Sequence, residues 1–233
     1  MHMRHIIATV FSLLFFCNNA SYAGQGCQQK PPSESMVTQG LALAVKTIDQ
    51  LNASGAEVVV IGRVGQDLSK YKQHYSHVGF AYKDGQTWRI IHKLNECGTA
   101  ISNIYQQGMG QFFLDDPFKF EAAFVVPTQE VQKRILAILT DPKKVLVEHT
   151  PQYSMLAYAW ATKYQQSNQW MLETLALAME PQINTREQAQ AWLKFKGYKP
   201  SILSIGPMTR LAGRVFKAMI IQMRSVLVIG LRR

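Results

Sequence analysis

The chain has 233 residues and a formal net charge of +10 at pH 7. The charge is uneven: residues 24–187 carry 15 Lys or Arg and 15 Asp or Glu, whereas residues 188–233 carry nine Lys or Arg and no acidic residue. A neutral body argues against a nucleic-acid-binding domain, whose basic residues would lie on the folded surface itself.

The first 23 residues are expected to be a secretory signal peptide. Arg4 precedes an apolar run over residues 6–16, and the small residues Ser21 and Ala23 fit positions −3 and −1 of a cleavage site. The apolar run is too short to span a membrane, although a short anchor left in place is the alternative. The protein is therefore predicted to be exported, to the periplasm or beyond, with residues 24–233 forming one domain.

Two cysteines remain after cleavage, Cys27 and Cys97. An exported protein with an even number of cysteines permits one disulfide, which here would join the N-terminus to the middle of the chain. A free, nucleophilic Cys97 is the alternative.

The first predicted elements are a loop, a helix and a strand. Residues 24–36 are polar and proline-bearing, which indicates a lead-in loop. Thr38 is predicted to cap a helix that runs to Asn52. The apolar residues of this helix have helical spacing: Leu41, Val45, Ile48 and Leu51. The β-branched run over 56–61 predicts a buried strand.

A β-hairpin is predicted over residues 76–82 and 87–94. Asp84-Gly85 lies between the two runs and is the strongest short-range signal for a two-residue hairpin loop.

With Asp84 and Gly85 as the loop, His77 directly faces His92 across the ladder. Facing residues have Cβ atoms roughly 4.5–5.5 Å apart, so the two imidazoles are expected side by side. A histidine held by a polar neighbour is how a general base is usually oriented. Gly79 on the same face is expected to leave space for another element.

The remaining chain is predicted to be mostly helical. Helices are expected over 101–113, 129–139, 168–179 and 186–195, with one strand over 121–126, while 145–166 shows no clear pattern. Thr128 is predicted to cap the helix over 129–139, and Thr185 to open the helix that runs to 195. Helices with a few antiparallel strands predict an α+β domain over 37–206, with a small antiparallel sheet packed by helices.

Ser167 is the candidate nucleophile for a histidine base. It lies where the helix predicted over 168–179 begins. The unpaired N–H groups and positive end of a helix stabilise an anionic nucleophile or a developing oxyanion.

Two segments carry a family resemblance, Tyr-Ser-His-Val-Gly at 75–79 and Ser-Asn-Gln-Trp-Met-Leu-Glu at 167–173. In this order they resemble the permuted papain-like amidases, relatives of the NlpC-type cell-wall hydrolases. They more closely resemble an exported bacterial family of unknown function, over most of residues 27–210. The resemblance implies a permuted papain-like arrangement, with a peptide or cell-wall amide as substrate and no cofactor or metal.

Carried over by position, His77 is the base, His92 its orienting partner and Ser167 the nucleophile. The family pattern has cysteine where this chain has Ser167. A thiolate can exist near neutral pH beside an imidazolium, whereas a serine hydroxyl must lose its proton during attack. The site is therefore either a weak serine hydrolase or, as we favour, one that binds but no longer cleaves.

Three simpler interpretations remain open. Ser167 or Asn168 can serve only as a helix cap. His77 and His92 can form a satisfied core pair without chemistry. A zinc site from His74, His77, His92 and Cys97 is also conceivable, since imidazole and thiolate are the usual zinc ligands.

The C-terminal segment, residues 207–233, is basic. An amphipathic helix is expected at its start, with Arg210, Arg214 and Lys217 on one face. Such a segment is expected to make peripheral contact with an anionic membrane surface. A binding module that uses this segment or the cleft is thus the alternative function.

Overall fold

The computed structural model of the chain describes residues 31–201, apart from 98, 116 and 156. The predicted signal peptide, Cys27 and the basic segment 207–233 lie outside the described residues. Within these ranges, no helix has the length and apolar character needed to cross a membrane.

The described part of the chain folds into one sheet with helices on both faces. Its elements are α2 (Glu34–Ala53), β1 (Val58–Val64), the 3-10 helix η1 (Ser69–Tyr71), β2 (His77–Asp84), β3 (Thr87–Asn95), β4 (Ser102–Gly108), α3 (Met109–Leu114), β5 (Lys119–Val125), α4 (Gln129–Leu139), the 3-10 helix η2 (Lys144–Leu146), α5 (Ser167–Met179) and α6 (Arg186–Phe195). The five strands are all antiparallel, in the order β4-β3-β2-β1-β5. The predicted α+β class, with a small antiparallel sheet packed by helices, is confirmed.

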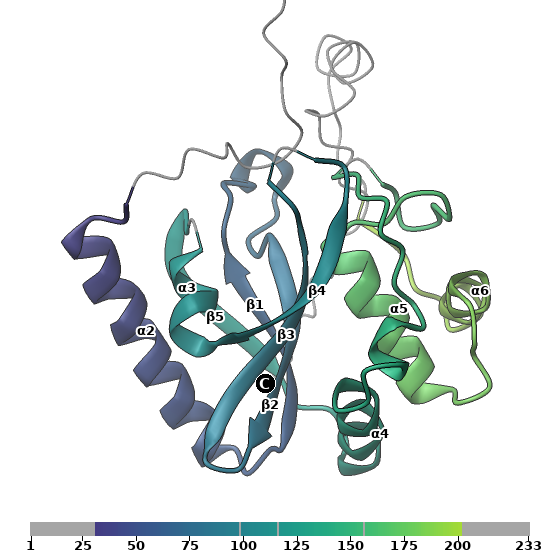
Figure 1. Cartoon of the computed structure of the whole chain (residues 1–233), viewed down its shortest axis with the longest axis horizontal. Coiled ribbons are helices and arrows are strands. Elements are labelled where there is room, and N and C mark those ends of the chain that lie inside the picture. The colour runs from purple at the N-terminus through teal and green to yellow at the C-terminus, as the bar shows by residue number, and fades with distance from the viewer. Residues whose placement is uncertain (1–30, 98, 116, 156, 202–233) are drawn as a thin grey trace, which may run out of the picture.

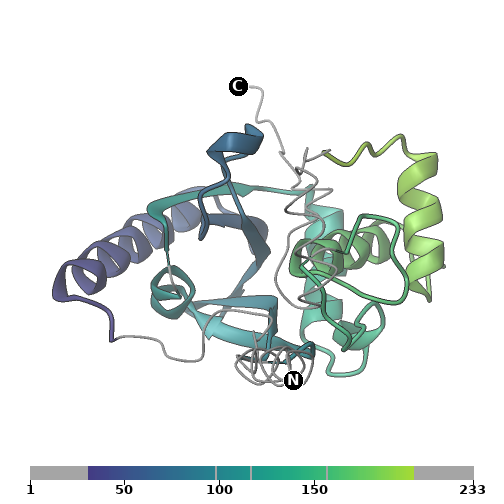
Figure 2. The ribbon, with the colours of Figure 1, turned by 90° about the horizontal axis from the view of Figure 1, so that it is seen from above.

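The sheet separates two hydrophobic cores. Helices α2 and α3 lie on one side of it and α4, α5 and α6 on the other, as two perpendicular views show (Figures 1 and 2). Strand β1 is buried along its whole length: Val59 and Ile61 pack with α2 and α3, whereas Val58 and Val60 pack with α4 and α5. Because successive strand residues point to opposite faces, a sheet covered on both sides requires this continuous apolar run.

Helix α2 differs from its prediction in both its start and its buried face. It begins at Glu34, and Ser33 caps it by accepting a hydrogen bond from the Met36 N–H (3.2 Å), so the cap at Thr38 and a lead-in loop to residue 36 are wrong. Its buried residues are Gly40, Ala44, Thr47 and Leu51, while Leu41 and Val45 are exposed. A Cβ on Gly40 would lie 2.5 Å from the Leu114 side chain, so small residues let α2 approach α3 closely.

The helix predicted over 101–113 is wrong in its first half. Residues 102–108 form the edge strand β4, and only then does the short helix α3 begin, with Gly108 at its N-cap. Only Ser102 of strand β4 is buried, so its sequence lacks the apolar alternation that marks a half-buried strand.

The hairpin register is shifted by two residues from the prediction. Asp84 pairs with Thr87 and Phe80 with Ile91, so the loop is Gly85-Gln86. Gly85 has φ +59 and no positive φ occurs at Gln86, which is the pattern of a II′ turn with glycine first. The prediction that His77 directly faces His92 is therefore wrong. A register shift of two residues nevertheless keeps every side chain on its predicted face of the sheet.

The later helices match their predictions closely. Thr128 caps α4 and Thr185 caps α6, each through its side-chain oxygen. Helix α5 begins one residue before the predicted 168, at Ser167.

Candidate functional site

The two predicted histidines are hydrogen-bonded to each other. His77 Nε2 lies 2.7 Å from His92 Nδ1, and the ring centroids are 5.0 Å apart at an interplanar angle of 72°. His92 is fully buried, whereas His77 is partly exposed. The contact is diagonal: His92 lies beside Gly79, where a Cβ would come within 2.9 Å of the His92 Cβ. Gly79 thus makes room for His92 and not, as predicted, for another element.

Strands β2 and β3 separate at the end where the histidines lie. Their pairing stops at Phe80 and Ile91, whereas β3 stays paired with β4 as far as Asn95. Residues 77–79 at the start of β2 therefore have no partner on β3, and the two strands diverge at this end of the sheet.

Asn168 occupies the opening and takes over the hydrogen bonds of the missing strand partner. Its Oδ1 accepts from the Val78 N–H and its Nδ2 donates to the Ser76 carbonyl, both at 3.1 Å. The first turn of α5 is thereby attached to β2 on either side of His77. Ser167 precedes Asn168 and therefore lies at the same end of the sheet.

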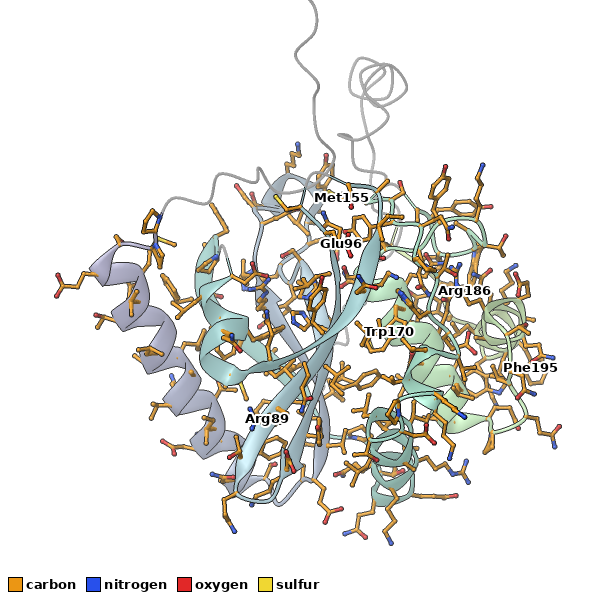
Figure 3. All side chains as sticks on the ribbon, in the orientation of Figure 1. Arg89, Glu96, Met155, Trp170, Arg186 and Phe195 are labelled. Atoms are coloured by element: carbon orange, nitrogen blue, oxygen red, sulfur yellow. The ribbon has the colours of Figure 1, made fainter. Side chains whose placement is uncertain are left out.

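His77 and Ser167 line one cavity of about 210 Å³. The other lining residues come from β1 and the loop after it, the residue before β2, the end of β3, the residue after α3, the segment before α5 and the start of α5. They are Arg63, Gly65, Gln66, Ser76, Leu94, Asn95, Asp115, Tyr153, Met155, Gln166 and Asn168. Figure 3 shows Met155 at the same end of the sheet as Glu96, while Trp170 lies deeper, between the sheet and α5. The structure therefore brings two predicted residues, His77 and Ser167, to one cavity, with His92 behind His77.

Ser167 is not a helix cap. The N-cap of α5 is Gln166, which makes no side-chain capping hydrogen bond, and the side chain of Asn168 is engaged with β2. The first helical backbone bond runs from the Trp170 N–H to the Gln166 carbonyl (3.2 Å), so the helix provides no acceptor for the N–H groups of 167–169. The interpretation of Ser167 or Asn168 as a helix cap is therefore wrong.

Tyr153 is a site residue that the sequence interpretation missed. Burial raises the pKa of its phenol, and a side-chain hydrogen bond with Ser167 partly offsets that increase. Its backbone is fixed by a parallel bridge with Gln165. The segment around Tyr153 carries no periodicity, so only its tertiary position reveals the contact.

Both histidines are neutral near pH 7. Burial, then the charge of Arg63, then His92 hold the pKa of His77 well below its usual range. Burial and the Arg63 charge lower the pKa of His92 to about 4. A neutral His77 can accept a proton, although its lowered pKa makes it a weak base.

The charge that acts on the pair is itself held by a salt bridge. Arg63 pairs with His77 in the β1–β2 register, and its Nη2 lies 2.6 Å from Asp115 Oδ2. The guanidinium also lies 5.0 Å from the centre of the Phe112 ring, which contacts both histidines. Arg63 thereby disfavours an imidazolium at the site.

A second buried polar cluster centres on Glu173. Its carboxylate accepts hydrogen bonds from Arg186 Nε (2.8 Å), Gln165 Nε2 (2.6 Å), Gln190 Nε2 (2.7 Å) and Gln169 Nε2 (3.1 Å). Arg186 in turn donates to backbone carbonyls of the irregular segment before α5. Gln169 and Glu173 both belong to the 167–173 segment. Through Arg186 they hold the irregular segment before α5 against α5 and α6.

The zinc and free-thiol alternatives are not supported. His74 Nε2 bonds to Glu121 Oε2 at 2.6 Å, and the described ranges contain no group of three or more His, Cys, Asp or Glu that could hold a metal ion. Cys97 is disulfide-bonded, so it is not a free nucleophile. Because Cys27 lies outside the described residues, the Cys27–Cys97 pairing stays a prediction.

Fold and site together define an α+β protein with a histidine pair and a helix N-terminus at one cavity. A family model described as "Uncharacterized protein conserved in bacteria (DUF2145)" matches residues 50–223. The chain belongs to this bacterial family of unknown function. Neither the curated proteins nor the solved structures contain a match.

Proposed function

We propose that the protein is an exported cell-envelope protein whose cleft is related to permuted papain-like amidases, and that it binds a peptide or cell-wall amide with weak or no cleavage. One observation supports this most strongly: His77 and Ser167 line the same cavity, with His92 behind the base. The chain order, histidine strand before nucleophile helix, fits the permuted arrangement. Export rests on the predicted signal peptide.

Acyl transfer at this site would proceed through Ser167. Its hydroxyl proton would pass to His77 while Oγ bonds to the substrate carbonyl carbon, and N–H groups at the start of α5 would hold the oxyanion. His77 would then give the proton to the leaving amine, and water would release the acyl group. The lowered pKa of His77 and the unionised hydroxyl both slow the first step, which is why we expect weak turnover at most.

An electrophilic serine probe, a fluorophosphonate, tests the catalytic part. We expect slow modification of Ser167, located by peptide mapping, and its loss in His77→Ala. Ser167→Ala is the control, because any labelling that remains in this variant occurs at another residue. Folded protein without any labelled Ser167 would remove cleavage from the proposal.

A membrane-binding role is the second candidate, favoured by nine basic and no acidic residues over 188–233. Anionic lipid attracts such a segment by about 1 kcal/mol per basic residue near the surface. Removing 207–233 should then reduce sedimentation with phosphatidylglycerol vesicles and leave neutral vesicles unaffected. Equal sedimentation of both proteins would contradict this role.

A further inference from the structure

Three side chains form a hydrogen-bonded chain across β2, β3 and β4. His77 Nε2 meets His92 Nδ1 at 2.7 Å, and His92 Nε2 meets the Gln107 side-chain oxygen, Oε1, at 2.9 Å. His92 pairs with Tyr105 in the β3–β4 register, so Gln107 is two residues further along the same face. Both contacts are thus diagonal steps between neighbouring strands.

Buried His92 has a hydrogen bond on each ring nitrogen, which makes its proton position depend on its neighbours. A neutral imidazole carries one N–H and one lone pair. The Gln107 Oε1 can only accept, so His92 carries its proton on Nε2 and accepts at Nδ1. His77 must then donate from Nε2, which leaves the lone pair on its Nδ1.

The opposite arrangement would disable the base. A donor at position 107 would place the His92 proton on Nδ1, and His92 would then donate to His77 Nε2. His77 would carry its proton on Nδ1 and could not accept one from Ser167 at that atom.

We propose that Gln107 is the positioning residue of this site, because its side-chain oxygen sets the tautomer of His92 and, through it, that of His77. Gln107 is partly exposed, so it is reached from solvent while its oxygen contacts the buried ring. The chemical consequence for Ser167 rests on the proposed function, whereas the tautomer order does not.

The test compares acceptor and donor side chains at position 107. Glutamate can only accept and lysine can only donate. In Gln107→Glu we expect the wild-type tautomers, and in Gln107→Lys a proton on His77 Nδ1. Nitrogen-15 shifts of the ring atoms at pH 7, from two-bond proton–nitrogen correlations on the full chain, distinguish protonated from unprotonated nitrogens.

Two further variants keep the test decisive. Gln107→Leu offers no partner, so both His77 tautomers should be populated even if lysine disturbs folding. Gln106→Lys is the matched control: it adds the same charge on the opposite face of β4, where Gln106 bonds to the Tyr82 hydroxyl (2.9 Å), and should leave the tautomers unchanged.

A proton on Nδ1 of wild-type His77, or one tautomer pattern shared by Gln107→Lys, Gln107→Leu and the wild type, would overturn the proposal. The measurement uses no substrate, so it is independent of acyl transfer. Expected tautomers without any labelling of Ser167 would remove cleavage from the proposed function and leave the role of Gln107 intact.

Discussion

Replacing Asn168 with alanine removes both hydrogen bonds that join the start of α5 to β2. The Ser76 carbonyl and the buried Val78 N–H lose their partner at the opened end of the sheet. Losing the bond to the Ser76 carbonyl costs about 1 kcal/mol net, and leaving the buried Val78 N–H without an acceptor costs about 1–3 kcal/mol. We therefore expect Asn168→Ala to lower the free energy of unfolding by about 2–4 kcal/mol.

Urea unfolding gives this value from the shift in midpoint, provided that the slope stays constant. Asn103→Ala is a matched control, because Asn103 is exposed and bonds only to Glu96 among the described side chains. The control should change the free energy of unfolding by less than about 0.5 kcal/mol. An Asn168→Ala effect as small as that of the control would refute the role of Asn168 as the attachment of α5.

Three further predictions concern the surroundings of the site. Gly79→Ala places a Cβ 2.9 Å from that of His92 and should lower the free energy of unfolding by about 1–3 kcal/mol in urea; an unchanged midpoint would argue against the close approach. Glu173→Gln leaves Arg186 buried without its charge partner and should lower the same free energy by about 3–5 kcal/mol, against less than about 1 kcal/mol for the exposed Glu130→Gln; similar effects of the two variants would contradict the buried pair. The pKa of His92 is about 4 in the fold and about 6.5 when unfolded, so lowering the pH from above 6.5 to 4 should reduce the free energy of unfolding by about 3 kcal/mol through this group. Urea unfolding of the wild type and of His92→Gln at both pH values measures this loss, and the same pH dependence in the two proteins would contradict it.

Sequence alone predicts the parts of the fold that carry strong periodicity or distinct end signals. Thr128 and Thr185 mark helix starts that the structure confirms, because a side-chain oxygen before an apolar-periodic run has few other local uses. The edge strand β4 could not be predicted because only Ser102 of its residues is buried, so no alternation of apolar residues marks it.

The site shows the same division between local and tertiary information. That His77 and His92 share a face follows from strand periodicity and survives a register error of two. The register itself depends on the turn type, since Gly85 takes the first loop position and not the second. Gln107 and Asn168 act through partners 15 and 90 residues away, which no local pattern encodes.

The measurement that tests the central claim most directly is the alkylation rate of Ser167→Cys with iodoacetamide at pH 7. Ser35→Cys is the control for a position in the first turn of a helix. Ser35 is exposed whereas Ser167 is buried, so a faster reaction at position 167 would occur in spite of its lower exposure. A thiolate at position 167 would provide the negative charge that favours an imidazolium at His77, which lowers the thiol pKa. We expect the thiol of Ser167→Cys to react about tenfold faster than the control thiol, and His77→Ala to abolish the difference. Equal rates for the two thiols, or a fast rate that survives His77→Ala, would contradict the account.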